Sequence, residues 1–176
     1  MLVRKNIETI WHAGLVVYGR EYWFSTHIES KDIQHTESAF GMAPTHVHDM
    51  GATTIDQRVF EDYLERELAP RFSLDRYETF TNNCNHMIDE ALTFLTAPSA
   101  EPQRLPYYIL EQSETILDNV SDLQADLTRK IATRVSRLIM VGWAKSNRAK
   151  EERERGWASE SRNFGRRVVD TGEMSV

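Results

Sequence analysis

The sequence has 176 residues, a formal net charge of −6 and 40% hydrophobic residues, which suits one compact domain with a tail. Its single cysteine excludes an internal disulfide and a multi-cysteine zinc site. It has no apolar run long enough to cross a membrane, and the N-terminus lacks the apolar stretch of a signal peptide. We therefore expect no transmembrane segment and a location in the cytoplasm, with the nucleus as a second location.

The first part of the chain predicts a small β-structure. Residues 15–18 and 21–24 are rich in β-branched and aromatic residues and flank Gly19, a pattern typical of a hairpin. Residues 25–46 are polar and predict a loop. Residues 47–51 predict a short strand.

A helix is expected next. Thr54 and Gln57 form a capping-box pattern, and Pro70 should end the helix. One apolar stripe should face the core: Val59, Phe60, Tyr63, Leu64 and Leu68. Residues 77–80 predict another short strand.

A second helix begins at the cysteine. Asn83 is a favourable N-cap residue, and it places Cys84 in the first turn. Prolines between residues 98 and 106 predict an irregular connection. The helix has a continuous apolar face, formed by Met87, Ile88, Ala91, Leu92 and Leu95.

The last part of the chain predicts a long helix from about Glu111. Residues 1–110 contain 9 basic and 16 acidic residues, whereas residues 129–150 contain seven basic residues and no acidic one. A basic amphipathic helix can bind an anionic membrane surface, a nucleic acid or a partner helix. We favour a helix that packs on the body with its charges in water. Its apolar stripe is Leu123, Leu127, Ile131, Val135 and Leu138.

Cys84 is the strongest candidate for chemistry. A cysteine is nucleophilic as the thiolate, and a helix N-terminus or a nearby imidazolium lowers the thiol pKa. The alternative is a small buried hydrophobic residue. A position between two asparagines at a helix start favours the nucleophile.

A cysteine nucleophile needs a base, and the chain has six histidines. His12 precedes the predicted strand at residue 15, from which it can face a helix N-terminus. His86 lies two residues from Cys84 and should point elsewhere. His46 and His48 could share a face in a metal site, but a third ligand at suitable spacing is missing. The remaining candidates lie in the predicted loop, at His27 and His35.

The common nucleotide-binding and hydrolase motifs are absent. The sequence has no P-loop, no dinucleotide-binding glycine pattern, no H-E-x-x-H zinc motif and no G-x-S-x-G serine motif. We therefore predict no cofactor, no metal and no nucleic-acid partner.

Several segments, in this order, resemble the PPPDE superfamily of desumoylating-isopeptidase-like cysteine peptidases over about residues 3–118. They are Ile10-Trp11-His12, residues 15–24, Met50-Gly51-Ala52-Thr53, residues 60–64, Asn83-Cys84-Asn85 and residues 105–109.

The resemblance implies an α+β, circularly permuted papain-like fold with a small antiparallel sheet and packed helices. It also implies a catalytic dyad of His12 and Cys84, with no obligatory third acid. The implied activity is removal of SUMO or ubiquitin from lysine through an acyl-enzyme, or alternatively removal of S-acyl groups as a thioesterase. Some relatives form homodimers, so a homodimer is implied as well.

The domain prediction follows from the extent of the resemblance. Residues 1–118 form the peptidase domain, residues 119–150 a basic amphipathic extension and residues 151–176 a charged, mobile tail. Compared with the family, the chain lacks about one strand before Trp11-His12, which raises the alternative of a non-catalytic binding module acting through the C-terminal helix. The family pattern has histidine where Asn82 stands, and Thr-Ser where Ala13-Gly14 stands.

Three further residues are candidates beside the dyad. Asn83 and Asn85 could stabilise the oxyanion or orient the catalytic groups, and the alternative is a capping role. Trp11 could form the wall of a groove for a Gly-Gly tail, and the alternative is core packing.

Overall fold

The computed structural model describes residues 11–34, 44–110 and 121–170, with the side chains of the last helix described up to residue 155. The predicted absence of an N-terminal strand concerns residues that lie outside these ranges. So do the predicted helix start at Glu111 and the end of the predicted tail.

A three-stranded antiparallel sheet forms the N-terminal part of the fold. Its strands are β1 (Leu15–Val17), β2 (Arg20–Phe24) and β3 (Ile28–Asp32), in the order β1-β2-β3. The predicted hairpin is confirmed, and Tyr18 and Gly19 form its turn with φ of 55° and 71°. A turn with positive φ at both central residues matches the twist of the strands.

The prediction of a loop over residues 25–46 is wrong at β3. This strand pairs with β2 along its whole length, with Glu21 opposite Lys31 and Trp23 opposite Glu29. Its residues are polar because it lies at the edge of the sheet in the described part of the chain, with side chains only partly buried. Pairing with β2 therefore produces a strand that composition alone does not indicate.

The first helical region comprises α2 (Gln57–Tyr63) and a continuing π-helical segment, η1 (Leu64–Leu68). It ends before Pro70, as predicted. The predicted N-cap is wrong, because Asp56 rather than Thr54 accepts the Arg58 N–H at 2.8 Å. The Gln57 amide bonds to Glu61 within the helix instead of reaching back.

The predicted strands at residues 47–51 and 77–80 are absent. Residues 47–54 have no regular secondary structure, and Glu78 forms an isolated bridge with Asn82. A 3-10 helix, η2 (Leu74–Arg76), precedes that bridge. The bridge forms a tight turn directly before Cys84.

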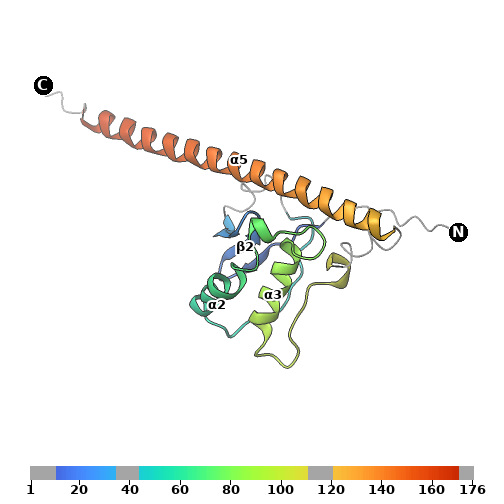
Figure 1. Ribbon diagram of the computed structural model, residues 1–176. Coiled ribbons are helices and arrows are strands. Elements are labelled where there is room, and N and C mark those ends of the chain that lie inside the picture. The colour runs from blue at the N-terminus through green and yellow to red at the C-terminus, as the bar shows by residue number, and fades with distance from the viewer. Residues whose placement is uncertain (1–10, 35–43, 111–120, 171–176) are drawn as a thin grey trace, which may run out of the picture. The chain divides into compact units, whose positions relative to one another are not determined.

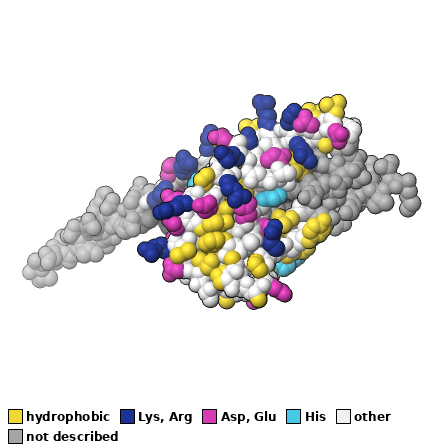
Figure 2. Space-filling view, turned by 60° about the horizontal axis from the view of Figure 1, so that its bottom comes forward, with side chains coloured by type: hydrophobic (Ala, Val, Ile, Leu, Met, Phe, Trp, Pro, Cys, Tyr) yellow, Lys and Arg dark blue, Asp and Glu magenta, His cyan; other side chains and the backbone are white. Residues whose placement is uncertain are grey.

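The helix α3 (Cys84–Thr96) packs against β2 and contributes much of the core (Figure 1). Its predicted apolar face is confirmed, since all five of those side chains are buried. They meet aromatic residues from β2, α2 and the following loop, namely Tyr22, Phe24, Phe60, Phe72 and Tyr77. The architecture is thus α+β. On the face of the molecule in Figure 2, exposed hydrophobic side chains lie among basic and acidic ones.

The last helix, α5 (Asp122–Asp170), continues well past Lys150, where the predicted tail begins. The chain divides into two compact units, residues 1–140 and residues 141–176, so the first turns of α5 belong to the first unit. No helix in the described ranges is both long and apolar enough to span a membrane.

The first turns of α5 pack on the body, as favoured, but they do so through polar side chains and Met140 and not through the apolar stripe. The side chains that hydrogen-bond to the body are Thr133, Ser136 and Arg137, which contact residues 75–79. The apolar stripe is exposed instead: Leu123, Leu127, Ile131, Val135 and Leu138. The core is already filled by the sheet, α2 and α3.

Candidate active site

Cys84 is the first residue of α3, and Asn83 caps that helix. The Oδ1 atom of Asn83 accepts hydrogen bonds from the N–H groups of Asn85 and His86 at 2.9 and 3.2 Å. Its amide donates to the Thr79 carbonyl at 2.7 Å. The cap therefore fixes the first turn of α3 and with it the position of the Cys84 thiol.

His12 lies opposite the thiol, although 72 residues separate the two in sequence. The Nδ1 atom of His12 is 3.1 Å from the Sγ atom of Cys84. His12 precedes β1, and β1 pairs with β2, against which α3 packs. His12 is an exposed residue whose ring turns its Nδ1 atom toward the half-buried Cys84, so the pair is desolvated at its contact and still open to a substrate from one side.

The surroundings of Cys84 favour the thiolate. Burial by itself raises the pKa of the thiol, but the charge and hydrogen bond of His12 lower it more. The backbone N–H groups of Ala13 and Asn85 lower the pKa further. The net result is a Cys84 pKa below its ordinary value of 9.0.

The surroundings of His12 favour the imidazolium. Burial lowers the pKa of His12, but the charge and hydrogen bond of Cys84 and the charge of Glu21 outweigh it and raise the pKa above 6.5. A thiolate–imidazolium pair is the form in which a cysteine attacks a carbonyl.

Asn85 connects α3 to the backbone on both sides of His12. Its Oδ1 atom accepts the Ala13 N–H at 3.0 Å, and its amide donates to the Trp11 carbonyl at 3.1 Å. The same amide donates to the Ile109 carbonyl at 3.4 Å. Asn85 is buried, so these bonds form away from bulk water. A single side chain thus holds the segment that carries His12 at the start of α3.

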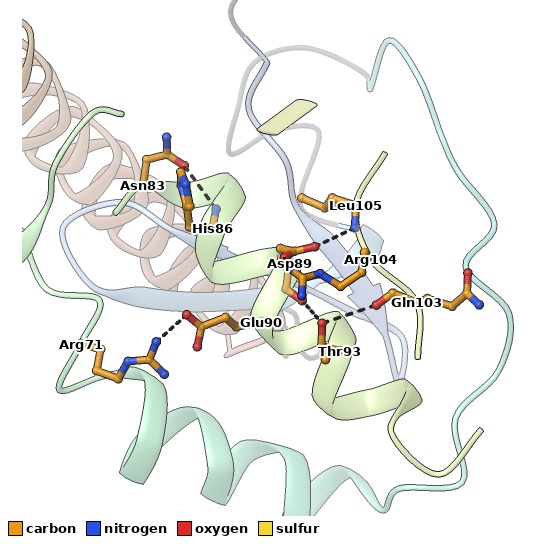
Figure 3. A network of polar contacts seen from close by, with 9 residues as sticks. All are labelled: Arg71, Asn83, His86, Asp89, Glu90, Thr93, Gln103, Arg104 and Leu105. Carbon is orange, nitrogen blue, oxygen red and sulfur yellow. Dashed lines mark hydrogen bonds and ion pairs between the residues drawn. The ribbon is translucent and has the colours of Figure 1, made fainter. Parts of the chain in front are cut away.

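The segment that ends at Ile109 is held on α3 by a buried carboxylate. Asp89 forms an ion pair with Arg104 and accepts the Leu105 N–H at 2.8 Å (Figure 3). Thr93 lies one turn further along α3 and contacts the Gln103 carbonyl at 3.5 Å. These contacts place the chain after α3 alongside the helix, where Ile109 reaches Asn85.

Glu21 is an acidic residue whose negative charge raises the pKa of His12. Its carboxylate lies against Gly14, so closely that a Cβ at residue 14 would overlap the carboxylate oxygen. Glycine at this position therefore makes room for the carboxylate near His12.

A partly exposed aromatic cluster surrounds Trp11. The rings of His46 and Tyr108 meet the Trp11 ring edge-on, with 5.0 and 6.0 Å between the ring centroids. The ring of His48 accepts or donates a hydrogen bond with the Tyr108 hydroxyl at 2.8 Å. The described residues contain no group of three potential metal ligands, so the His46/His48 pair has no third ligand there.

The other candidates are engaged elsewhere. The Nδ1 atom of His86 lies 2.7 Å from the Asn83 Oδ1 atom. His27 contacts Thr26, and His35 lies outside the described residues. Asn82, at the position where the family has histidine, donates to the carbonyls of Arg71 and Arg76 at 3.0 and 2.8 Å.

A family model described as the PPPDE putative peptidase domain matches residues 1–125 of the 176. The chain belongs to this family. The expected PPPDE resemblance is confirmed, and the family match extends seven residues beyond the predicted boundary at residue 118, into α5.

Two curated relatives are similar to this chain at 30% identity over 118 residues: desumoylating isopeptidase 1 of Homo sapiens and of Rattus norvegicus. Each match covers 66% of this chain and 66% of the relative. Desumoylating isopeptidase 1 of Xenopus laevis is 26% identical over 117 residues, covering 66% of this chain and 65% of the relative. The chain thus spans slightly less than two thirds of the length of these relatives.

Three contributors to the site were not identified from sequence. Glu21 and Asp89 stand in strand and helix patterns where charged residues are ordinary, and the Ile109 carbonyl is a backbone group. The signal for Glu21 was its position in a hairpin that begins next to His12. The burial of Asp89 has no signal in the sequence, because it depends on how residues 103–105 return to α3.

Proposed function

We propose that this PPPDE protein is a cysteine isopeptidase that removes a ubiquitin-like modifier from lysine. The observation that carries the proposal is the 3.1 Å approach of His12 Nδ1 to Cys84 Sγ at the first turn of α3. The names of the relatives, desumoylating isopeptidase 1, make SUMO conjugates the first substrate to test.

The proposed reaction begins from the thiolate–imidazolium pair. The Cys84 sulfur attacks the carbonyl carbon of the isopeptide bond and forms a tetrahedral oxyanion. When that intermediate collapses, the C–N bond breaks and His12 donates its proton to the leaving lysine amine. Water, deprotonated by His12, then attacks the thioester, releases the modifier carboxylate and regenerates the Cys84 thiolate.

The oxyanion in this proposal is stabilised by backbone rather than by asparagine side chains. The amides of Asn83 and Asn85 already donate to the Thr79, Trp11 and Ile109 carbonyls. The N–H of Cys84, at the first position of α3, belongs to the group of helical N–H groups that lack an intrahelical acceptor. Removal of one oxyanion-hole donor raises the reaction barrier by about 3–4 kcal/mol in well-studied hydrolases. Asn85 then acts as the orienting residue and Asn83 as the cap.

Trp11 in this proposal forms one wall of the site that receives the flexible C-terminal tail of the modifier. It is partly exposed and stands beside His12 with His46 and Tyr108 around it. A flat aromatic surface accepts glycine backbone closely, because glycine has no side chain to clash.

The test is covalent labelling with SUMO and with ubiquitin that carry a thiol-reactive group at the C-terminus. We expect an adduct with one modifier that is absent in Cys84→Ala and slow in His12→Ala. Failure of both probes, together with turnover of a model S-acyl thioester by Cys84, would assign the same dyad to a thioesterase. A folded protein that reacts with neither class would exclude the catalytic proposal and leave the binding module. Light scattering on the same sample tests whether the protein forms the homodimer that the family resemblance implies.

A further inference from the structure

The first turns of α5 carry an exposed hydrophobic stripe that the proposed chemistry does not use. Its members are between 48% and 80% exposed, high values for large aliphatic side chains: Leu123, Leu127, Ile131, Val135, Leu138 and Ile139. They recur at intervals of three and four residues, so they lie on one side of the helix. A continuous exposed stripe of this kind marks an interaction surface.

The stripe faces away from the body of the first unit. Thr133, Ser136 and Arg137 bond to residues 75–79, and Arg137 donates to the Tyr77 carbonyl at 2.7 Å. At 100° per residue, these three positions fall on the side of the helix opposite the centre of the stripe. The bonds to the body therefore fix α5 with its apolar side outward.

Basic side chains border the stripe. Arg134 is exposed and lies along one edge of it by helical spacing, as does Lys130, whose ammonium also pairs with Asp126 of the same helix at 2.6 Å. Residues 129–150, all within α5, contain seven basic residues and no acidic one. Long basic side chains beside an apolar stripe can bury their methylene groups and keep the charge at a polar interface. An apolar stripe with a basic edge is complementary to a partner surface that has an apolar interior beneath a layer of anionic groups.

We propose that α5 binds an anionic lipid surface, with the stripe of Leu123 to Ile139 in the interface and the basic edge on the headgroups. Such helices lie in the plane of the membrane and do not cross it. This agrees with the lack of a helix suited to span a membrane in the described ranges. It would bring Cys84 to substrates held at that surface.

A coiled coil with a second copy fits the stripe less well. A heptad register through Leu127, Ile131 and Leu138 would place Arg134 in the core of the coiled coil. A second copy would also bring one basic 129–150 segment against another. The stripe spans a broad arc, as interfacial helices do, rather than the narrow seam of a coiled coil.

The experiment is flotation of the full-length protein with phosphatidylcholine vesicles, with and without phosphatidylserine. We expect binding to the anionic vesicles that weakens as salt rises. Lys130→Ala and Arg134→Ala should each weaken binding about fivefold at low salt. Cys84→Ala should bind as the parent does, because the stripe and the thiol are separate.

A matched pair of variants isolates the stripe. Val135 in α5 and Val59 in α2 are 48% and 50% exposed, so a change to glutamate has similar structural effects at both. Val135→Glu should weaken vesicle binding about tenfold, the loss expected when one valine leaves an apolar contact. Val59→Glu should bind like the parent. Both variants should keep the circular dichroism spectrum of the parent.

Equal effects of the two valine variants would overturn the proposal, as would a parent protein that does not bind anionic vesicles. A concentration-dependent dimer that Val135→Glu dissociates, in the absence of vesicle binding, would also overturn it and assign the stripe to a second copy.

Discussion

Replacement of Asn85 by alanine tests the link between α3 and the segment that carries His12. The side chain of Asn85 is 5% exposed and bonds to both backbone neighbours of His12. Alanine fills the start of the helix without strain but cannot bond to the Ala13 N–H or the Trp11 carbonyl. Two backbone groups then lose their partner in a site with little water.

The expected loss of stability follows from these two bonds. A buried polar group left without its partner destabilises a protein by about 1–3 kcal/mol. Two such groups, partly relaxed by movement of residues 11–13, predict that Asn85→Ala lowers the free energy of unfolding by about 2–4 kcal/mol. The weaker bond to Ile109, at 3.4 Å, adds little.

The functional consequence is a displaced imidazole. The segment that carries His12 would no longer be held at 3.1 Å from Cys84, so the pKa of the thiol should rise toward its ordinary value. The assay has two readouts on one protein: urea unfolding for stability, and the rate of Cys84 alkylation as a function of pH. We expect Asn85→Ala to be alkylated more slowly than the parent below pH 7. At alkaline pH, where the thiol ionises in both proteins, the two alkylation rates should become similar.

Asn82→Ala is the matched control. Asn82 also donates to two backbone carbonyls, but these belong to Arg71 and Arg76 and not to the segment around His12. This variant should lose stability and keep the alkylation profile of the parent. If Asn85→Ala also keeps that profile while it loses stability, Asn85 has a structural role and does not position His12.

Four further outcomes are expected. Turnover of a conjugate should follow a bell with pH, because the reaction requires a pH above the lowered pKa of Cys84, for the thiolate, and below the raised pKa of His12, for the proton given to the leaving amine. His12→Ala should slow alkylation at pH 6 by at least about tenfold, since the thiolate fraction falls tenfold for each unit by which the thiol pKa rises; an unchanged rate would exclude the dyad. Glu21→Gln removes a negative charge that raises the pKa of His12, so the alkaline limb of the bell should move to lower pH, while an upward or absent shift would contradict this role. Asp89→Ala leaves the Leu105 N–H without its acceptor and should lower the free energy of unfolding, measured by urea denaturation, by about 1.5–3 kcal/mol. The control is Asp62→Ala, which should change it by less than about 0.5 kcal/mol because the ion pair of Asp62 with Arg66 is exposed.

Local sequence was sufficient wherever structure depends on neighbouring residues. Asn83 followed by Cys84 and a face of five apolar residues specifies a capped helix, because the cap and the face are both encoded within four turns. The β1–β2 hairpin was likewise evident from two β-rich runs around Gly19. Since a helix N-terminus stabilises negative charge, the position of Cys84 already indicated a reactive thiol.

Local sequence failed where one segment depends on a distant one. The strand β3 exists because β2 offers an edge to its polar residues. The cap of α2 is a different, local case, since Asp56 and Thr54 stand two residues apart and have similar N-cap propensities. The outward stripe of α5 was unexpected because an amphipathic pattern shows that a face is apolar but not which surface covers it.

The sequence alone identified the candidate nucleophile, its place at the start of a helix, and membership in a peptidase family through motifs in a fixed order. It offered six histidines as partners and favoured His12 slightly from its position and more strongly from the family resemblance. Tertiary structure decided what surrounds the pair: Asn85 bonds across 72 and 74 residues to the backbone on either side of His12, and Glu21 adds its charge from the neighbouring strand. These contacts join segments far apart in the chain, and no periodicity or local propensity records which of them will meet.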